Sequence, residues 1–413
     1  MKHIKLISSL LVITAVVLAA CQPAAPAFTP PTDPLGVVTI PPGEPIHIAY
    51  WGVLSGADAT LGEDSKRGVE LQIDDNGGKL LGRSIRLTTE DGLCTPEGGA
   101  TAAQKLAADT TLVGLIGSSC SDETVGGIKT LNEAGLTTIS PSNTRPALTD
   151  PSRDATFAGY LRTAHSDAFQ GKAVAEFVFN ELKLKTAATI HDGSAYAEAL
   201  QQVMVDNFKQ LGGTVTVQEA VSKGQTDMKP VLTLVAATKP DVIYYPIFIA
   251  EGGFITAQAR EVPGLEKTVL IGSDGMFSPD FIKAAGPAAE NMYLSSPDFT
   301  AFQAGYQDFL KKHTAKYGGN PLSIFHAHAY DATGILFAAL QKVAVTGPDG
   351  TIYVPKKALR DAIFATQGYR GLTGVLTCGQ YGDCGAPIIA VYQVTAREVG
   401  GQWPPEKPIW PKK

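Results

Sequence analysis

The sequence predicts an α/β protein of two lobes, each with a parallel sheet covered by helices and joined by a hinge that the chain crosses more than once. Strand-like and helix-like segments alternate from residue 46 onward, which is typical of such sheets. The alternation restarts near residue 164 with a second set of similar size. The roughly 370 residues beyond the N-terminal region suffice for two domains. Several crossings between the lobes would make a hinge that closes around a ligand.

The first lobe is assigned to residues 46–163 and 297–384, the second to 164–296 and 385–400, and a tail to 401–413. The first lobe is expected to contain strands at 46–54, 84–91, 113–116 and 137–140, with helices at 62–76, 96–108, 122–133, 300–317 and 323–345. The second is expected to contain helices at 167–182, 196–211, 228–237 and 252–260, with strands at 187–191, 214–221, 241–248, 268–272 and 291–295. A hairpin is expected over 371–394.

Residues 1–20 have the features of a signal peptide: a basic start and an apolar run too short to span a membrane comfortably. The run ends in Leu-Ala-Ala-Cys21, which resembles a lipobox, so we expect Cys21 to be the lipidated first residue of the mature chain. The alternatives are an ordinary signal peptide and a buried strand. Residues 21–45 are rich in Pro, Ala and Thr and predict a tether behind the anchor. The expected location is therefore extracytoplasmic, on the membrane surface.

The composition is that of a folded binding domain. The chain is 44% hydrophobic and 18% charged, and its formal net charge is −6. The hydrophobic content supports a sizeable core, and the acidic balance argues against nucleic acid as a partner. After the N-terminal run, no apolar stretch reaches the length of a membrane span.

Four cysteines remain beyond Cys21, and an even number in an exported chain favours two disulfides. Cys378 and Cys384 are spaced like a clasp across a hairpin. Cys94 and Cys120 each follow an expected strand, and a bridge would join those strand ends if the strands are neighbours. A zinc site is the alternative, but it would require close Cys-x-x-Cys pairs that this sequence lacks.

Residues 112–144 organise the first lobe. An expected strand runs into the polar loop 117–121, a helix follows, and a second short strand runs into the polar loop 141–144. Hydroxyl groups and backbone N–H groups at strand ends and at a helix N-terminus can hold an anion without Lys or Arg. With Ser121 as the expected N-cap, this stretch predicts a site for a carboxylate, or else an ordinary capped helix.

The sequence lacks the common catalytic signatures, including the nucleophile elbow, the P-loop, the dinucleotide fingerprint and the zinc-protease motif. His326 and His328 lie two positions apart in an expected helix and so point to different faces. We therefore predict no catalysis, no metal site and no cofactor.

Three places in the second lobe suit a binding cleft. Tyr196 follows one strand end, Asp274 follows another, and Phe248 and Ile249 end a third strand. Asp274 on one lobe and the anion site on the other would be complementary to a zwitterion. Alternatively, Asp274 is only a turn residue, Tyr196 packs at the start of a helix, and Phe248 and Ile249 are ordinary core residues.

Ordered matches along residues 46–394 resemble the branched-chain amino acid-binding proteins of ABC importers, of the leucine/isoleucine/valine-binding type. These have the type I periplasmic binding protein fold, with two Rossmann-like lobes. The matching segments are Leu54-Ser55-Gly56, the pair Cys94 and Cys120, Ile139-Ser140-Pro141 with Asn143-Thr144, Leu161-Arg162-Thr163-Ala164, Ile190-His191-Asp192 with Tyr196, Val242-Ile243-Tyr244-Tyr245, and Gly272-Ser273-Asp274-Gly275.

The resemblance implies a role for each matching position. Ser121 matches a residue that binds the ligand α-carboxylate, Thr144 a second carboxylate contact, and Asn143 a backbone contact. Tyr196 matches a cleft tyrosine, and Asp274 an acidic residue that binds the α-ammonium. The resemblance also implies that lobe closure presents the liganded form to a membrane permease, without catalysis.

The chain departs from the family pattern at the side-chain pocket. Leu61 stands where an aromatic residue is frequent, Phe248 and Ile249 replace a tyrosine pair, and Asp274 is one methylene shorter than the usual Glu. We therefore expect a monomeric, lipid-anchored binding protein for a branched-chain or other apolar amino acid, delivered to an ABC permease. The alternative is a sensor of the same fold for an amide or a small organic acid, coupled to a signalling partner.

Overall fold

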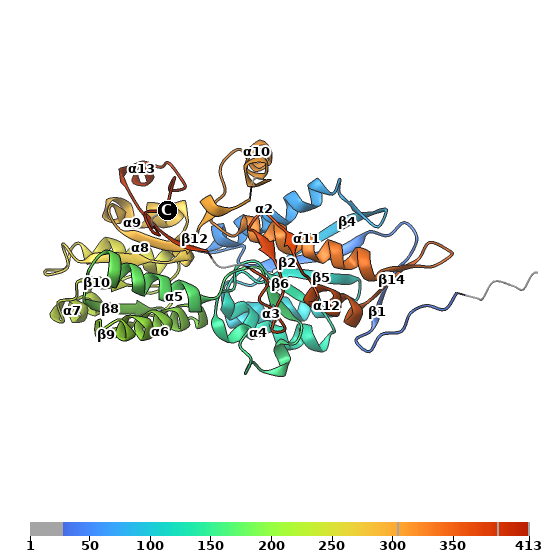
Figure 1. Ribbon diagram of the computed structural model, residues 1–413, viewed down its shortest axis with the longest axis horizontal. Helices are drawn as coiled ribbons and strands as arrows, with labels where there is room; N and C mark the ends of the chain where they lie inside the picture. Colours follow the sequence, from blue (N-terminus) through green and yellow to red (C-terminus); the bar gives the residue numbers. More distant parts are fainter. Residues whose placement is uncertain (1–27, 304, 386–387, 412–413) are drawn as a thin grey trace, which may run out of the picture.

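The computed structural model describes residues 28–303, 305–385 and 388–411, which form two lobes side by side (Figure 1). Each lobe contains a six-stranded sheet flanked by helices. Most strands in both sheets are parallel, and each sheet has one antiparallel strand at its edge. The predicted two-lobed α/β fold is therefore confirmed, with mixed rather than purely parallel sheets.

The first lobe is built on the sheet β3-β4-β2-β5-β6-β7. Its strands are β2 (Ile46–Gly52), β3 (Lys79–Leu80), β4 (Arg83–Asp91), β5 (Leu112–Gly117), β6 (Thr138–Ser140) and β7 (Tyr160–Arg162). Its helices are α2 (Ala59–Asp75), α3 (Pro96–Ala108), α4 (Ser121–Glu133), α10 (Gly305–Tyr317), α11 (His326–Val343) and α12 (Lys356–Phe364). Helix α3 packs against α4, and α2 packs against α11. Strands β2 and β5 are fully buried, as expected for the centre of a covered sheet.

The second lobe is built on the sheet β17-β12-β11-β10-β8-β9. Its strands are β8 (Thr186–His191), β9 (Thr214–Ala220), β10 (Val242–Tyr244), β11 (Val269–Gly272), β12 (Tyr293–Pro297) and β17 (Ile389–Gln393). Its helices are α5 (Asp167–Glu176), α6 (Ala195–Gln210), α7 (Lys229–Ala237), α8 (Ile249–Ala259), α9 (Pro279–Ala285) and α13 (Ala396–Val399). The chain passes between the two sheets after β7, after β12 and again before β17.

The expected tether, residues 21–45, is shorter than the composition suggests. Strand β1 (Val37–Ile40) pairs with β14 (Ile352–Pro355), which also pairs with β13 (Val345–Thr346). Val38 and Ile40 are buried in the core of the first lobe. This short segment forms a strand despite its Pro-rich surroundings because its apolar side chains alternate with polar ones and become buried. The expected signal peptide (residues 1–20) and lipidation site (Cys21) lie outside the described residues.

Two expectations for the C-terminal part were wrong. The expected hairpin over 371–394 does not form. The short pair β15 (Tyr369–Arg370) and β16 (Val375–Leu376) lies in the first lobe, whereas β17 joins the second sheet beside β12. Within 401–411, the expected tail packs on the second lobe, where Trp410 bridges to Val391 and its ring contacts Phe177.

Both expected disulfides form. Cys94 is bonded to Cys120, and Cys378 to Cys384. The first bridge joins the loop after β4 to the start of α4, because β4 and β5 both flank β2 in the sheet. No helix within the described ranges is long and apolar enough to cross a bilayer.

Candidate ligand-binding cleft

A small cavity lies between the lobes at the carboxyl ends of their strands, where open α/β sheets bind ligands. Its volume is about 20 Å³, so the lobes are nearly closed on each other. The first lobe contributes the end of β5, the start of α4 and the start of α2. The second contributes the loops after β8, β10 and β11. The lining residues are Leu61, Ser119, Cys120, Ser121, Ser142, Tyr196, Phe248, Asp274, Gly275 and Phe325.

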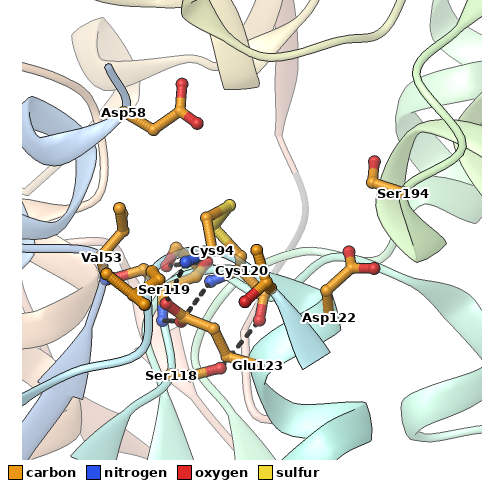
Figure 2. Close-up of a disulfide and its surroundings, with 12 residues drawn as sticks. Val53, Asp58, Cys94, Ser118, Ser119, Cys120, Asp122, Glu123 and Ser194 are labelled. Atoms are coloured by element: carbon orange, nitrogen blue, oxygen red, sulfur yellow. Dashed lines mark hydrogen bonds between the residues drawn. A yellow bond between two sulfur atoms is a disulfide. The ribbon is translucent and has the colours of Figure 1, made fainter. Parts of the chain in front are cut away.

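The N-terminus of α4 forms the polar end of the cavity (Figure 2). The buried Glu123 carboxylate accepts hydrogen bonds from the backbone N–H groups of Cys94 (2.9 Å), Ser119 (3.0 Å) and Cys120 (3.0 Å). Burial raises the pKa of Glu123 to about 7. The N-cap is Cys120 and not Ser121, because Ser121 already begins the helix. Ser121 therefore brings its hydroxyl and a first-turn N–H, which lacks an intrahelical acceptor, to the cavity.

The second polar loop, residues 141–144, packs against the first, residues 117–121. The Asn143 side chain donates to the carbonyl oxygen of Ser118 (3.0 Å) and accepts from the Thr124 hydroxyl (2.6 Å). Thr144 is fully buried, and its hydroxyl lies beside the Asp167 carboxyl and lowers its pKa. Neither Asn143 nor Thr144 lines the cavity. Ser142 of the same loop does, and it was not singled out from the sequence.

Asp274 lies at the opposite end of the cavity from Ser121's helix, in the second lobe. Its carboxylate accepts hydrogen bonds from the Tyr196 hydroxyl (2.8 Å) and the Gln170 amide (2.7 Å). The Tyr196 hydroxyl is also within 2.6 Å of the Ser273 hydroxyl. Burial raises the pKa of Asp274, and the hydrogen bonds from Tyr196 and Gln170 oppose this rise. Asp274 is therefore a buried carboxylate held by two hydrogen bonds, and its role toward a ligand stays a prediction.

A second buried carboxylate, Asp167 at the start of α5, lies beside Asp274. Burial raises the pKa of Asp167 well above its ordinary value, and the neighbouring Asp274 raises it further. Two carboxylates buried together favour either a shared proton or a cationic group between them. Sequence reasoning did not single out Asp167, because a Ser-Asp pair at a helix start is an ordinary N-cap signal.

Apolar side chains form the remaining wall. Leu61 and Phe248 line the cavity as expected, and the Phe248 ring packs against Tyr196 at 5.2 Å between centroids. Phe325, which precedes α11, lines it as well and was not anticipated. Ile249 does not line the cavity, because its side chain packs into the core of the second lobe.

Contacts across the cleft hold the lobes together. Asp58, before α2, accepts a hydrogen bond from the Ile249 N–H at the start of α8 (3.1 Å). Lys223 of the second lobe donates to the Cys94 carbonyl oxygen (3.0 Å), and its ammonium lies 3.8 Å from Asp58. Burial raises the pKa of Asp58 to about 6. These partners are distant in sequence and belong to different lobes, so no local motif signals them.

The histidines within the described ranges show no arrangement for a metal. His326 contacts the Asp64 carboxylate at 3.1 Å and the Tyr306 hydroxyl at 2.8 Å, both inside the first lobe. Burial lowers the pKa of His328 to about 3. Among the described residues, no group of three His, Cys, Asp or Glu side chains could hold a metal ion.

Comparison with known proteins identifies the family. Residues 45–396 match the family model described as a periplasmic binding protein. The chain belongs to this family. Because the periplasmic binding protein family consists of solute-binding proteins, the chain is a binding protein and not an enzyme, and its location is extracytoplasmic.

Its relatives in the periplasmic binding protein family include amino acid-binding proteins. An amino acid binding protein of Pseudomonas aeruginosa is 27% identical over 243 residues, which cover 58% of this chain and 63% of that protein. A Leu/Ile/Val-binding protein homolog of Brucella melitensis is 25% identical over 353 residues, covering 84% and 91% respectively. The crystal structure of a leucine-binding protein from Thermotoga maritima is similar in fold, with a TM-score of 0.75 and 22% identity over 85% of this chain and 95% of that one.

Proposed function

We propose that this protein binds a branched-chain or other apolar amino acid between its lobes and delivers it to an ABC permease, as a monomer anchored to the membrane through Cys21. The observation that carries the proposal is the polarity of one cavity. The first lobe lines it with a helix N-terminus that carries the Ser121 hydroxyl, the second lobe lines it with the buried Asp274 carboxylate, and apolar side chains complete the wall.

The amino acid's carboxylate is placed at the start of α4. Ser121 offers a hydroxyl and a backbone N–H there, and the positive end of the helix dipole favours an anion. Because Glu123 occupies the N–H groups of Ser119 and Cys120, it fixes the loop shape and leaves the next N–H groups to the ligand. Asn143 and Thr144 act in this proposal by supporting the loop.

The amino acid's ammonium is placed at Asp274, beside the Tyr196 hydroxyl. A charged ammonium would make a charge-assisted hydrogen bond to Asp274. It would also offset the free-energy cost of burying two neighbouring carboxylates. This explains why the second lobe tolerates Asp167 and Asp274 side by side. The ligand thereby contributes the positive charge that the pair favours.

The side chain of the amino acid is placed against Leu61, Phe248 and Phe325, while Ile249, the residue after Phe248, lies in the core of the second lobe. This wall has no charged group, which favours an aliphatic or aromatic side chain. The leucine/isoleucine/valine-binding and leucine-binding proteins among its relatives favour leucine, isoleucine or valine. A side chain of that size needs more than about 20 Å³, so binding requires the lobes to part and close again.

The decisive experiment is calorimetric titration of the chain from Gln22, stripped of ligand by partial unfolding, with leucine, isoleucine, valine and phenylalanine. We expect saturable binding that Asp274→Asn weakens about 100-fold, because the change leaves the buried ammonium unpaired. The matched control is Asp280→Asn, an exposed change six residues further along.

Two results would contradict the proposal. If none of the four amino acids binds, the ligand belongs to another class, such as an amide or a small organic acid. That result would favour the alternative function, a sensor of the same fold coupled to a signalling partner. If leucine binds equally well to the wild type and Asp274→Asn, the amino acid is oriented in some other way.

A further inference from the structure

A fully buried arginine, Arg162 at the end of β7, holds the chain that follows the second polar loop. Its guanidinium donates hydrogen bonds to the carbonyl oxygens of Asn143 (3.3 Å) and Arg145 (2.8 Å). A further hydrogen bond, of 2.6 Å, goes to the Thr149 hydroxyl. One side chain of the sheet therefore holds the segment 143–149 at both of its ends.

The segment that Arg162 holds continues into the wall of the cleft. Ser142 lies directly before it, lines the cavity, and donates its hydroxyl to the Ser119 carbonyl oxygen at 2.9 Å. The backbone N–H of Arg145 donates to the Ser121 hydroxyl at 3.4 Å. The positions of two hydroxyl groups that line the cavity, those of Ser142 and Ser121, therefore depend on the place of this segment.

The charge of Arg162 is balanced by the Asp383 carboxylate, which accepts a hydrogen bond from the guanidinium Nε. A buried guanidinium needs a charged partner, because its removal from water is costly. The side chain of Asp383 is itself 50% exposed. Burial alone therefore does not keep Asp383 beside Arg162.

The loop closed by the Cys378–Cys384 disulfide keeps Asp383 in place. The Arg162 N–H donates to the Gly382 carbonyl oxygen at 2.8 Å, and the Cys384 N–H donates to the Arg162 carbonyl oxygen at 3.0 Å. Gly382 has a φ of 91°, and a Cβ there would lie 2.5 Å from a carbonyl oxygen of β7. The loop thus packs closely on the strand and presents the Asp383 carboxylate to Arg162.

The ion pair lies where the chain passes between the lobes. Strand β7 leads to the first crossing, toward α5, and residues 382–385 come before β17 at the last one. Arg162, Asp383 and the segment 143–149 nevertheless all belong to the first lobe. The ion pair can therefore hold this segment whether the lobes are open or closed.

We propose that Arg162 and Asp383 are positioning residues for ligand binding, and that the Cys378–Cys384 loop is the support that keeps Asp383 in place. Arg162 holds residues 143–149 so that the hydroxyls of Ser142 and Ser121 are in position before a ligand enters the cleft. Such preorganisation raises affinity, because less of the protein has to be ordered on binding. The inference rests on the amino acid-binding function proposed above and gives a role to a disulfide that lies outside the cavity lining.

The first test examines the segment without a ligand. Hydrogen exchange of the chain from Gln22, followed by mass spectrometry of peptides that cover residues 141–149, compares the wild type with Asp383→Asn. We expect exchange in these residues to be about tenfold faster in Asp383→Asn, because Arg162 loses its charged partner and holds the segment less firmly. The matched control is Asp361→Asn, which removes an exposed carboxylate of the same lobe that pairs with Lys357. The control should exchange like the wild type over residues 141–149.

The second test measures leucine affinity by calorimetry. Asp383→Asn and the double variant Cys378→Ser/Cys384→Ser should each bind leucine about fivefold to tenfold more weakly. Their combination should be no weaker than the weaker of the two, because both changes remove the same support. Ile40→Ala, a change in the core of the same lobe, separates position from stability. It should lower the unfolding temperature and leave leucine affinity unchanged.

Several outcomes would overturn the proposal. They are unchanged exchange over residues 141–149 in Asp383→Asn, unchanged leucine affinity in that variant, and an equal loss of affinity in Ile40→Ala, which would make stability the cause. Additive losses in the combined variant would overturn the role of the disulfide loop. A wild type that binds no amino acid would contradict the function proposed for the cleft, while the exchange measurement would still decide whether Asp383 positions the segment.

Discussion

The Asp122 carboxylate, on the first helical turn of α4, accepts hydrogen bonds of 3.0 and 3.1 Å from the backbone N–H of Ala195, the first residue of α6 in the other lobe. Figure 2 shows Asp122 directed toward Ser194, the N-cap of α6. Asp58 makes the equivalent contact with α8 through the Ile249 N–H. Two carboxylates of the first lobe thus complete the N-termini of two helices of the second, and both contacts exist only when the lobes are closed.

Asp122→Ala should shift the protein toward the open form. The loss of a charge-assisted hydrogen bond weakens closure, and because ligand binding is coupled to closure, we expect leucine affinity to fall about fivefold to tenfold. Small-angle scattering of the liganded protein should show a larger radius of gyration. The control is Glu133→Ala at the other end of the same helix, where the side chain is exposed. Unchanged affinity and radius in Asp122→Ala would mean that the contact does not hold the lobes.

Glu123 should make stability depend on pH. Its pKa is about 7 in the folded protein against an ordinary value of 4.5, so the folded state binds this proton more tightly and gains stability as the pH falls from 7 toward 4.5. Relative to Glu123→Gln, the wild type should gain on the order of 3 kcal/mol over that range. The measurement is urea unfolding of both proteins at several pH values.

The comparison with Glu123→Gln is needed because other groups titrate in the same window. Burial lowers the pKa of His165 to about 4 and of His328 to about 3, so these residues reduce stability as the pH falls below 6.5. Their effect is common to both proteins and cancels in the difference. A difference that stays constant with pH would show that the pKa of Glu123 is the same in the folded and unfolded states. Glu133→Gln, an exposed substitution at the other end of α4, is the control.

The two disulfides should contribute unequally to stability. Cys94 and Cys120 are separated by 26 residues, and Cys378 and Cys384 by six. Loop-closure entropy predicts losses of about 3.5 and about 2 kcal/mol when each pair is replaced by serine. Denaturant unfolding of the two double variants measures both values. The reverse order would show that local packing, and not loop length, sets the contribution of each bridge.

Ile40→Ala should destabilise the first lobe by about 2–4 kcal/mol, because Ile40 is buried in its core through strand β1. Thr39→Ala is the matched control, since Thr39 is exposed between two buried residues of the same strand. Thermal unfolding of the chain from Gln22 measures both. If the two variants unfold at the same temperature, residues 37–40 behave as the plain tether that the composition suggests.

Part of the cavity lining was predictable from local sequence pattern. Ser121, Tyr196 and Asp274 each lie just beyond the end of a strand, and the alternation of elements shows that such ends meet at one edge of a sheet. Both disulfide pairings were also predicted, although β4 and β5 are not neighbours as the expectation for Cys94 and Cys120 required, because β2 lies between them.

The remaining features depend on contacts between distant segments. Phe325 reaches the cleft because α11 packs against α2, and Asp58 finds its partner on the other lobe. Asn143 and Thr144 lie outside the cavity lining, since the direction of a loop after its strand end is not encoded in its composition. Strand β1 was missed because only four apolar-patterned residues stand within a Pro-rich stretch.

The strand pairing of β1 also limits the length of chain between a lipid anchor and the first lobe. The side chain of Asp33 accepts hydrogen bonds from the backbone of Lys357 and Ala358 at the start of α12. The twelve peptide links from Cys21 to Asp33 span at most about 43 Å. Figure 1 places β1 and α12 toward the end of the first lobe that is remote from the second. An anchored molecule would therefore stay within one protein diameter of the bilayer, attached by that end, and would meet a membrane partner at a high effective concentration.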